Sequence, residues 1–119
     1  MANKINDSFV VNAGGAWSYL ARIQNPITGA NVTQAALASI SRAITNKVSG
    51  AVTTTAITVS AAVYDTLQTN TDLWSETYNF KDDVAYSILT ERVRHTLQYT
   101  FTYANGQVSK TREVDVEGD

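Results

Sequence analysis

The chain has 119 residues, enough for one domain, and combines 44% hydrophobic with only 17% charged residues at a net charge of −2. Uncharged polar residues fill the difference, with 16 Thr, 9 Ser, 9 Asn and 5 Gln. This balance argues against a nucleic-acid-binding protein, which needs a basic surface. The absence of cysteine excludes disulfides and thiolate chemistry, and a single histidine excludes any site that needs two.

Residues 1–15 are predicted to form a flexible N-terminal arm. The arm contains one apolar run, Phe9-Val10-Val11, and ends in Asn12-Ala13-Gly14-Gly15, whose glycines give the backbone freedom. Burial of such side chains is worth about 1.5–3 kcal/mol each, so we expect Phe9, Val10 and Val11 to pack against another subunit as an added strand. A first strand that starts at Ser8 and belongs to the domain itself is the competing interpretation.

The first twelve residues lack the apolar run of an export signal, and no segment reaches the length of a membrane span. We therefore expect a chain that is made in the cytoplasm and does not enter a membrane.

The middle of the chain is predicted to contain short strands separated by turns. A strand with an aromatic face covers residues 17–23, and Asn25-Pro26 ends it. Residues 33–48 fit both helical spacing and alternation, so we expect one helical turn over 33–38 and a strand over 39–47. Further along we expect a strand over 55–60, a short helical crossover over 61–67, a polar loop over 68–72 and a brief edge strand over 78–80.

The clearest predicted element is a C-terminal hairpin. Residues 94–103 alternate strictly, and one face carries His95, Leu97, Tyr99, Phe101 and Tyr103. Asn105-Gly106 follows, the dipeptide favoured by a two-residue type I′ turn.

A two-residue turn determines the pairing of the whole hairpin. It predicts that Tyr103 faces Val108 near the turn and that Leu97 faces Val114 further along. At the open end it predicts two more pairs, His95 with Val116 and Arg94 with Glu117. Tyr99 and Phe101 are expected to be buried.

Six or seven short antiparallel strands with frequent turns predict an all-β protein, an immunoglobulin-like β-sandwich with the flexible N-terminal arm attached. The arm takes residues 1–15 and the sandwich domain residues 16–119. A small open barrel is the competing architecture.

No catalytic motif is present, and we expect no enzyme, no cofactor and no metal site. His95 is alone on the apolar face, so we interpret it as a half-buried structural histidine. Five oxygen-bearing side chains could converge as a calcium site, but no glycine-assisted tight loop accompanies them. They are Asp65, Asn70, Asp72, Asp82 and Asp83.

Aromatic residues are the remaining candidates for a binding surface. They could form the core, a partner interface or a platform for sugar rings. The set is Trp17, Trp74, Tyr78, Phe80 and Tyr86. The candidate partner interface consists of Phe9, Val10, Val11, Trp74, Tyr78 and Phe80.

Three stretches of the chain resemble small immunoglobulin-like proteins from the structural gene clusters of tailed bacteriophages and prophages. They run from Ala21-Arg22 to Asn31-Val32-Thr33-Gln34-Ala35, from Ile57 through Tyr64-Asp65-Thr66-Leu67-Gln68, and from Trp74 to Tyr78-Asn79-Phe80. The similarity covers roughly residues 20–104. It implies an immunoglobulin-like fold and a virion component, and it carries over no catalytic residue.

We therefore expect a non-enzymatic virion structural protein, assembled in the host cytoplasm, that acts as capsid cement or decoration or as a neck or tail adaptor. Its expected partners are other capsid, neck or tail subunits and further copies of itself, without nucleic acid or membrane. A nearly neutral polar surface suits this role because it avoids repulsion between many copies. The alternative is a carbohydrate- or receptor-binding β-sandwich module.

Overall fold

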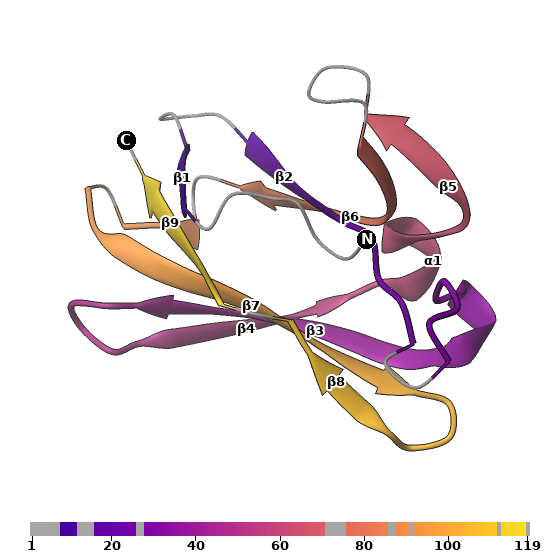
Figure 1. Cartoon of the computed structure of the whole chain (residues 1–119). Helices are drawn as coiled ribbons and strands as arrows, with labels where there is room; N and C mark the ends of the chain where they lie inside the picture. The colour runs from indigo at the N-terminus through magenta and orange to yellow at the C-terminus, as the bar shows by residue number, and fades with distance from the viewer. Residues whose placement is uncertain are drawn as a thin grey trace.

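The computed structural model describes residues 8–11, 16–25, 28–70, 76–85, 88–90, 92–111 and 113–118. These residues form a β-sandwich of two sheets with very little helix (Figure 1). The all-β sandwich architecture is therefore confirmed. Nine strands occur in the described residues, two more than the largest number expected.

The larger sheet has six strands in the order β1-β9-β7-β3-β4, and β8 also pairs with β7. Its strands are β1 (Ser8–Val11), β3 (Leu37–Asn46), β4 (Val52–Ile57), β7 (Arg94–Tyr103), β8 (Val108–Lys110) and β9 (Val114–Gly118). All pairs in this sheet are antiparallel except β1 with β9, which is parallel.

Strand β1 corrects the prediction of a free arm over residues 1–15. Ser8 pairs with Asp115 and Val11 with Gly118, so this segment forms an edge of the larger sheet. The competing interpretation, a first strand that begins at Ser8, matches the structure for these four residues. Residues 1–7 and 12–15 lie outside the described residues.

The smaller sheet has the order β2-β6-β5, with β2 (Ala16–Ala21), β5 (Val63–Asn70) and β6 (Glu76–Ala85). The brief edge strand predicted over 78–80 is wrong, because β6 is a ten-residue strand in the centre of this sheet. The predicted crossover and polar loop over 61–72 are also wrong in large part. Helix α1 (Val59–Ala62) is a single turn, and β5 starts immediately after it.

The predicted helical turn and strand over residues 33–47 are confirmed with small shifts. A 3₁₀ turn, η1 (Gln34–Ala36), leads directly into β3. Alternation on β3 places Ile40, Arg42 and Ile44 on the buried face. The next strand, predicted over 55–60, lies three residues earlier as β4.

The C-terminal hairpin has the predicted pairs at its open end: Leu97 with Val114, His95 with Val116 and Arg94 with Glu117. Near the turn the prediction is wrong, because Val108 pairs with Thr102 instead of Tyr103. A one-residue slip turns a side chain to the opposite face of a sheet, and Val108 is accordingly 58% exposed.

Two irregularities explain this mixed result. The loop has three residues, since the Tyr103 N–H donates to the Gln107 carbonyl at 2.8 Å and Gly106 alone of the loop has a positive φ, of 92°. This is the type I turn with a glycine bulge, and a type I′ turn would need positive φ at Asn105 as well. Between the Thr100–Lys110 and Leu97–Val114 pairs, β7 spans two residues and its partner three. This second shift cancels the first.

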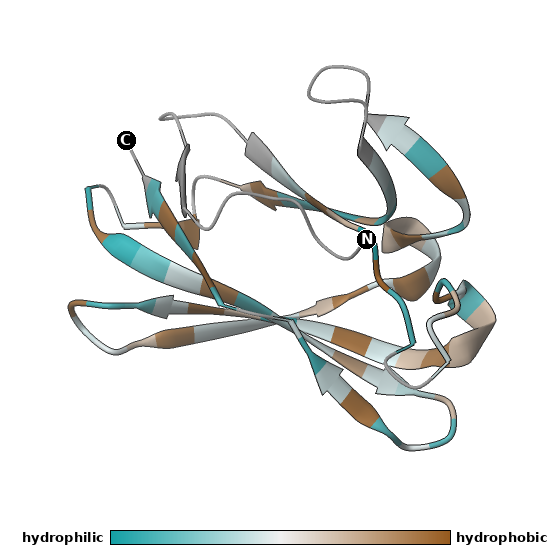
Figure 2. Ribbon diagram, in the orientation of Figure 1, coloured by the Kyte–Doolittle hydropathy of each residue, from teal (hydrophilic) through white to brown (hydrophobic). Residues whose placement is uncertain are grey.

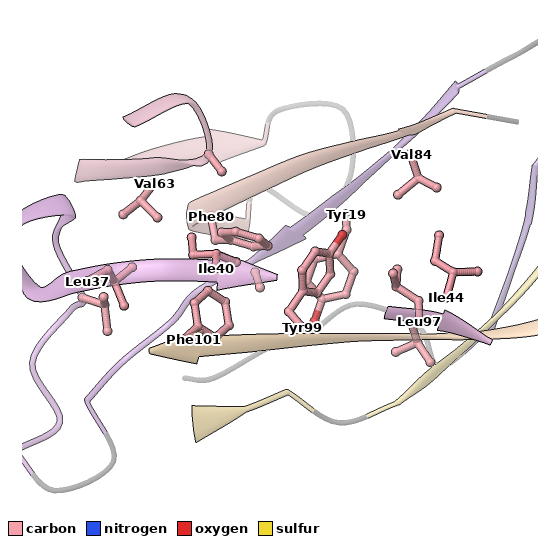
Figure 3. Packing of buried hydrophobic residues seen from close by; sticks show 14 of the residues in the cluster. Tyr19, Leu37, Ile40, Ile44, Val63, Phe80, Val84, Leu97, Tyr99 and Phe101 are labelled. Carbon is pink, nitrogen blue, oxygen red and sulfur yellow. The ribbon is translucent and has the colours of Figure 1, made fainter. Parts of the chain in front are cut away.

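The core lies between the two sheets. Hydrophobic and polar residues alternate along β3 and β7, so that each strand turns one hydrophobic face inward (Figure 2). Four aromatic rings meet at its centre (Figure 3): Tyr19, Phe80, Tyr99 and Phe101. The predicted burial of Tyr99 and Phe101 is confirmed, at 0% and 3% exposure.

Candidate interaction surface

The structure does not gather the predicted interface residues into one surface. Phe80 is fully buried among the core rings, so its assignment to a partner interface is wrong. Tyr78 is half-buried and packs edge-on against Tyr64, with ring centroids 5.8 Å apart. Phe9, Val10 and Val11 lie on the edge strand β1, but only their backbone is described, and Trp74 lies outside the described residues.

The most uniform exposed surface is the outer face of the larger sheet, which we call the threonine face. Of the outward-pointing positions of β3, β4, β7 and β8, read from the strand register, it leaves out the charged Arg94 and Lys110 and the buried Thr96 and comprises the others. These are Ser39, Ser41, Ala43, Thr45, Val52, Thr54, Ala56, Gln98, Thr100, Thr102 and Val108. None of them is charged, and all are small, β-branched or amide side chains.

Charged residues border the threonine face. Lys110 pairs with Thr100 at the end of β8, and Arg94 and Glu117 pair at the far end of β7. A neutral face of short side chains can pack against another surface at little cost in side-chain entropy or desolvation. The alternation along each strand is visible in the sequence. Only the pairing of β3, β4 and β7 shows that the uncharged outward positions form one surface.

Polar groups inside the sandwich connect the two sheets. Arg42 on β3 donates from Nη1 to Asp82 Oδ2 on β6 at 2.7 Å, and Tyr99 on β7 donates its hydroxyl to the same oxygen at 2.6 Å. Burial, followed by the negative charge of Asp82, raises the pKa of Tyr99 far above its usual value. Arg42 and Tyr99 belong to the larger sheet and Asp82 to the smaller one, so these buried hydrogen bonds connect the two sheets.

This cluster was not predicted from the sequence, although a signal was present. Arg42 occupies an inward position between Ile40 and Ile44, and a charge on an apolar face needs a buried partner. Its partner lies forty positions away in the sequence, which no local pattern reveals.

His95 is on the predicted face but is more deeply buried than expected, at 2% exposure. Its Nε2 accepts a hydrogen bond from the Thr90 backbone N–H at 3.1 Å, while Nδ1 is buried without a partner. The histidine therefore holds the segment before β7 against the sheet.

Of the side chains that could form a calcium site, Asp65, Asp82 and Asp83 do not converge, while Asp72 and the side chain of Asn70 lie outside the described residues. Asp65 accepts a hydrogen bond from the Gln34 N–H, Asp82 pairs with Arg42, and Asp83 accepts one from Ser18. Among the residues that the structure describes, no group of three or more His, Cys, Asp or Glu is placed to hold a metal ion.

Two residues of the stretches compared in the sequence analysis, Asn79 and Asp65, have structural roles. Asn79 is buried on β6, where its amide oxygen accepts from the Ile23 N–H at 2.7 Å and its amide nitrogen donates to the Ile23 and Val32 carbonyls. Asp65 on β5 accepts the Gln34 N–H at 2.8 Å and so anchors η1. These stretches determine how the connections dock on the smaller sheet.

A shallow, open groove of about 700 Å³ lies between the start of β3 and the end of β4, lined by residues such as Leu37, Ile57 and Val59. Gln34 also lines the groove, and its side chain donates to the Val63 carbonyl at 2.8 Å. Since Gln34 and Asp65 already bond within the protein, the groove offers few groups to a ligand.

Comparison with family models, curated proteins and solved structures gives no match in any of the three. In the described part of the chain, no helix is long and apolar enough to cross a membrane.

Proposed function

We propose that this chain is a non-enzymatic, immunoglobulin-like virion structural protein of a tailed bacteriophage, acting as capsid cement or decoration or as a neck or tail adaptor. The observation that carries the proposal is the threonine face, a broad uncharged surface on one side of a small sandwich. The similarity of residues 20–104 to immunoglobulin-like phage proteins supplies the class of particle.

The strand order supports the immunoglobulin-like part of the proposal. In immunoglobulin domains strands G, F and C lie side by side, C′ extends that sheet in variable-type domains, and strands B, E and D share the other sheet. The order β9-β7-β3-β4 corresponds to G-F-C-C′, and β2-β6-β5 corresponds to B-E-D.

This chain departs from antibody domains by having no cysteine. Antibody domains link strands B and F with a disulfide between the sheets. Here the corresponding strands β2 and β7 meet through Tyr19 and Tyr99, whose ring centroids are 4.8 Å apart. A ring contact needs no oxidising compartment, which suits a protein assembled in the cytoplasm.

The threonine face supports a role on a repeating particle. Many copies bound close together repel one another if each carries a strong charge, and a neutral docking face avoids this. Short Thr, Ser and Ala side chains also lose little entropy when covered. The carbohydrate-binding alternative gains nothing from Phe80, which is buried, or from Tyr78, which lies edge-on to Tyr64 with an interplanar angle of 82°.

The proposal is tested by counting copies of the chain in particles purified from an induced lysate of a host that carries the gene. Quantitative mass spectrometry should find the chain at a fixed number of copies per particle. Hundreds of copies would indicate the head, and about six or twelve the neck or baseplate. Absence from the particles, or millimolar glycan binding by the free protein at one site per domain, would overturn the proposal.

A variant pair tests the docking face itself. Val108→Lys adds a charge to the threonine face, whereas Gln107→Lys adds the same charge one residue earlier, at the exposed residue that follows the turn. Incorporation into particles should fall for Val108→Lys and stay normal for Gln107→Lys. Equal incorporation of both variants would argue against this face.

A further inference from the structure

Strand β4 forms one edge of the larger sheet, and among the described strands only β3 pairs with it. Proteins commonly protect such edges with charges, prolines or bulges. Strand β4 has none of these: its register with β3 is unbroken, and no charged residue occurs from Val48 to Tyr64. Val52 on this strand is 58% exposed.

The backbone of β4 presents its free groups in a regular pattern. The Asn46 N–H donates to the Ala51 carbonyl at 2.8 Å, which makes Asn46 and Ala51 a hydrogen-bonded pair. Hydrogen-bonded and non-bonded pairs alternate along an antiparallel ladder. Val52, Thr54 and Ala56 are therefore the residues whose N–H and C=O groups point away from β3, toward the open edge.

We propose that this edge pairs with β4 of a second copy, antiparallel, across a two-fold axis at Thr54. The axis places Thr54 opposite Thr54 and Val52 opposite Ala56, so that all three residues with free backbone groups meet partners with free groups. The three pairs would form about six hydrogen bonds. The same residues have their side chains on the threonine face, and this register keeps them there in both copies.

Charge favours a second copy as the occupant. In a two-fold contact each side chain near the axis meets its own counterpart, so any charge there would repel itself. An uncharged strand is compatible with itself and offers no charge pattern to select a different partner. The two larger sheets would join into one continuous sheet. This inference is independent of the proposed virion role.

Amide hydrogen exchange of the unmodified protein tests the pairing and its register. Raising the protein concentration about a hundredfold should slow exchange of the Val52, Thr54 and Ala56 amides. The Thr53 and Thr55 amides, which point toward β3, should be protected at both concentrations. Association that leaves the exchange of the first three amides unchanged would overturn the proposal, as would a protein that stays monomeric throughout.

Charge variants at the axis provide a second test by sedimentation equilibrium. Thr54→Lys and Thr54→Glu should each raise the dimer dissociation constant at least about tenfold, because like charges meet at the axis. An equimolar mixture of the two should regain dimers, because opposite charges then meet. Val108→Lys carries the same added charge on the same face, but β3 and β7 lie between its strand and β4, so it should dimerise like the wild type. Dimers of Thr54→Lys as stable as the wild type, or a mixture that stays monomeric, would overturn the proposal.

Discussion

Three buried polar side chains fasten this sandwich together. Arg42 and Asp82 form an ion pair between the two sheets, and Asn79 holds the connection after β2 through hydrogen bonds to backbone groups. A buried polar group is costly when it lacks a partner, so each of these residues demands its own partners. They therefore favour one docking of the sheets over others.

Removing Arg42 alone should destabilise the fold strongly. Arg42→Met leaves the Asp82 carboxylate buried beside Tyr99, at an expected cost of about 3–5 kcal/mol in the free energy of unfolding. The double variant Arg42→Met/Asp82→Asn should be more stable than Arg42→Met, because the buried charge is gone and an amide oxygen still accepts the Tyr99 hydroxyl. Urea denaturation measures the free energy of unfolding of the single and the double variant, with exposed Arg94→Met as the control. A double variant less stable than the single would contradict the assigned role.

Tyr99 should make stability depend on alkaline pH. Its pKa is raised in the folded protein, mainly by burial and then by Asp82, so the neutral phenol stabilises the fold fully below the unfolded pKa of about 10. As the pH rises above that value, the unfolded chain releases this proton while the folded chain keeps it, and stability is lost. Urea midpoints should fall above about pH 10 more steeply in the wild type than in Tyr99→Phe. The control Tyr78→Phe should follow the wild-type curve, and parallel curves for all three proteins would contradict this prediction.

At the scale of elements, the C-terminal hairpin shows how a pairing can be right for a reason other than the expected one. The loop takes one more residue than a type I′ turn would, and the irregularity between β8 and β9 takes one more in compensation. The Thr111 side-chain oxygen accepts the Tyr99 N–H at 3.0 Å within this irregularity. The hairpin therefore changes which face Val108 occupies without disturbing Val114 and Val116 in the core.

Gly106→Ala should destabilise the hairpin through the backbone alone. Gly106 has a φ of 92°, and an added Cβ would meet no atom within 4 Å. The expected cost is therefore the conformational penalty of about 1–2 kcal/mol for an L-residue in this region. Thermal or urea unfolding measures it, with Gln107→Ala, next to the turn, as a control. An unchanged stability would mean that the loop readily adopts another turn.

At the scale of the whole molecule, the two sheets differ in size, and the two edges of the larger sheet differ from each other. The smaller sheet has only three strands, and its central strand β6 contributes Phe80, Asp82 and Val84 to the interior. The larger sheet ends in β1 on one side and in β4 on the other (Figure 1). On one side the N-terminal strand β1 pairs with β9, so that β9 is not an edge strand. On the other side no described strand pairs with the outer edge of β4.

Deleting residues 1–11 should lower the thermal unfolding midpoint, because β9 would lose its parallel partner and become an edge itself. Each kcal/mol lost corresponds to about 4–8 °C for a domain near this size. Deleting residues 1–7 removes no residue of β1 and should leave the midpoint unchanged. Differential scanning calorimetry distinguishes the two. An unchanged midpoint after the longer deletion would restore the original prediction of an arm that acts on another subunit.

The sequence by itself determined that the chain is mostly β-strand, which face of β7 is buried and the register at the open end of the hairpin. Alternation along a strand is a local property, and the composition left no room for disulfides or a long apolar helix. The burial of Tyr99 and Phe101 followed from that alternation. The sequence also showed how few charges the chain has, but not where the uncharged residues gather.

Tertiary structure alone decided the central place of β6, the parallel pairing of β1, the partner of Arg42 and the assembly of the threonine face. Each of these joins residues far apart in the chain, such as Arg42 with Asp82 or Ser8 with Asp115. Local patterns state which face of a strand is apolar but not which strand lies beside it, because that choice depends on how all the strands pack at once. Phe80 was for this reason assigned to an interface, although the pairing of β6 between β2 and β5 places it in the core.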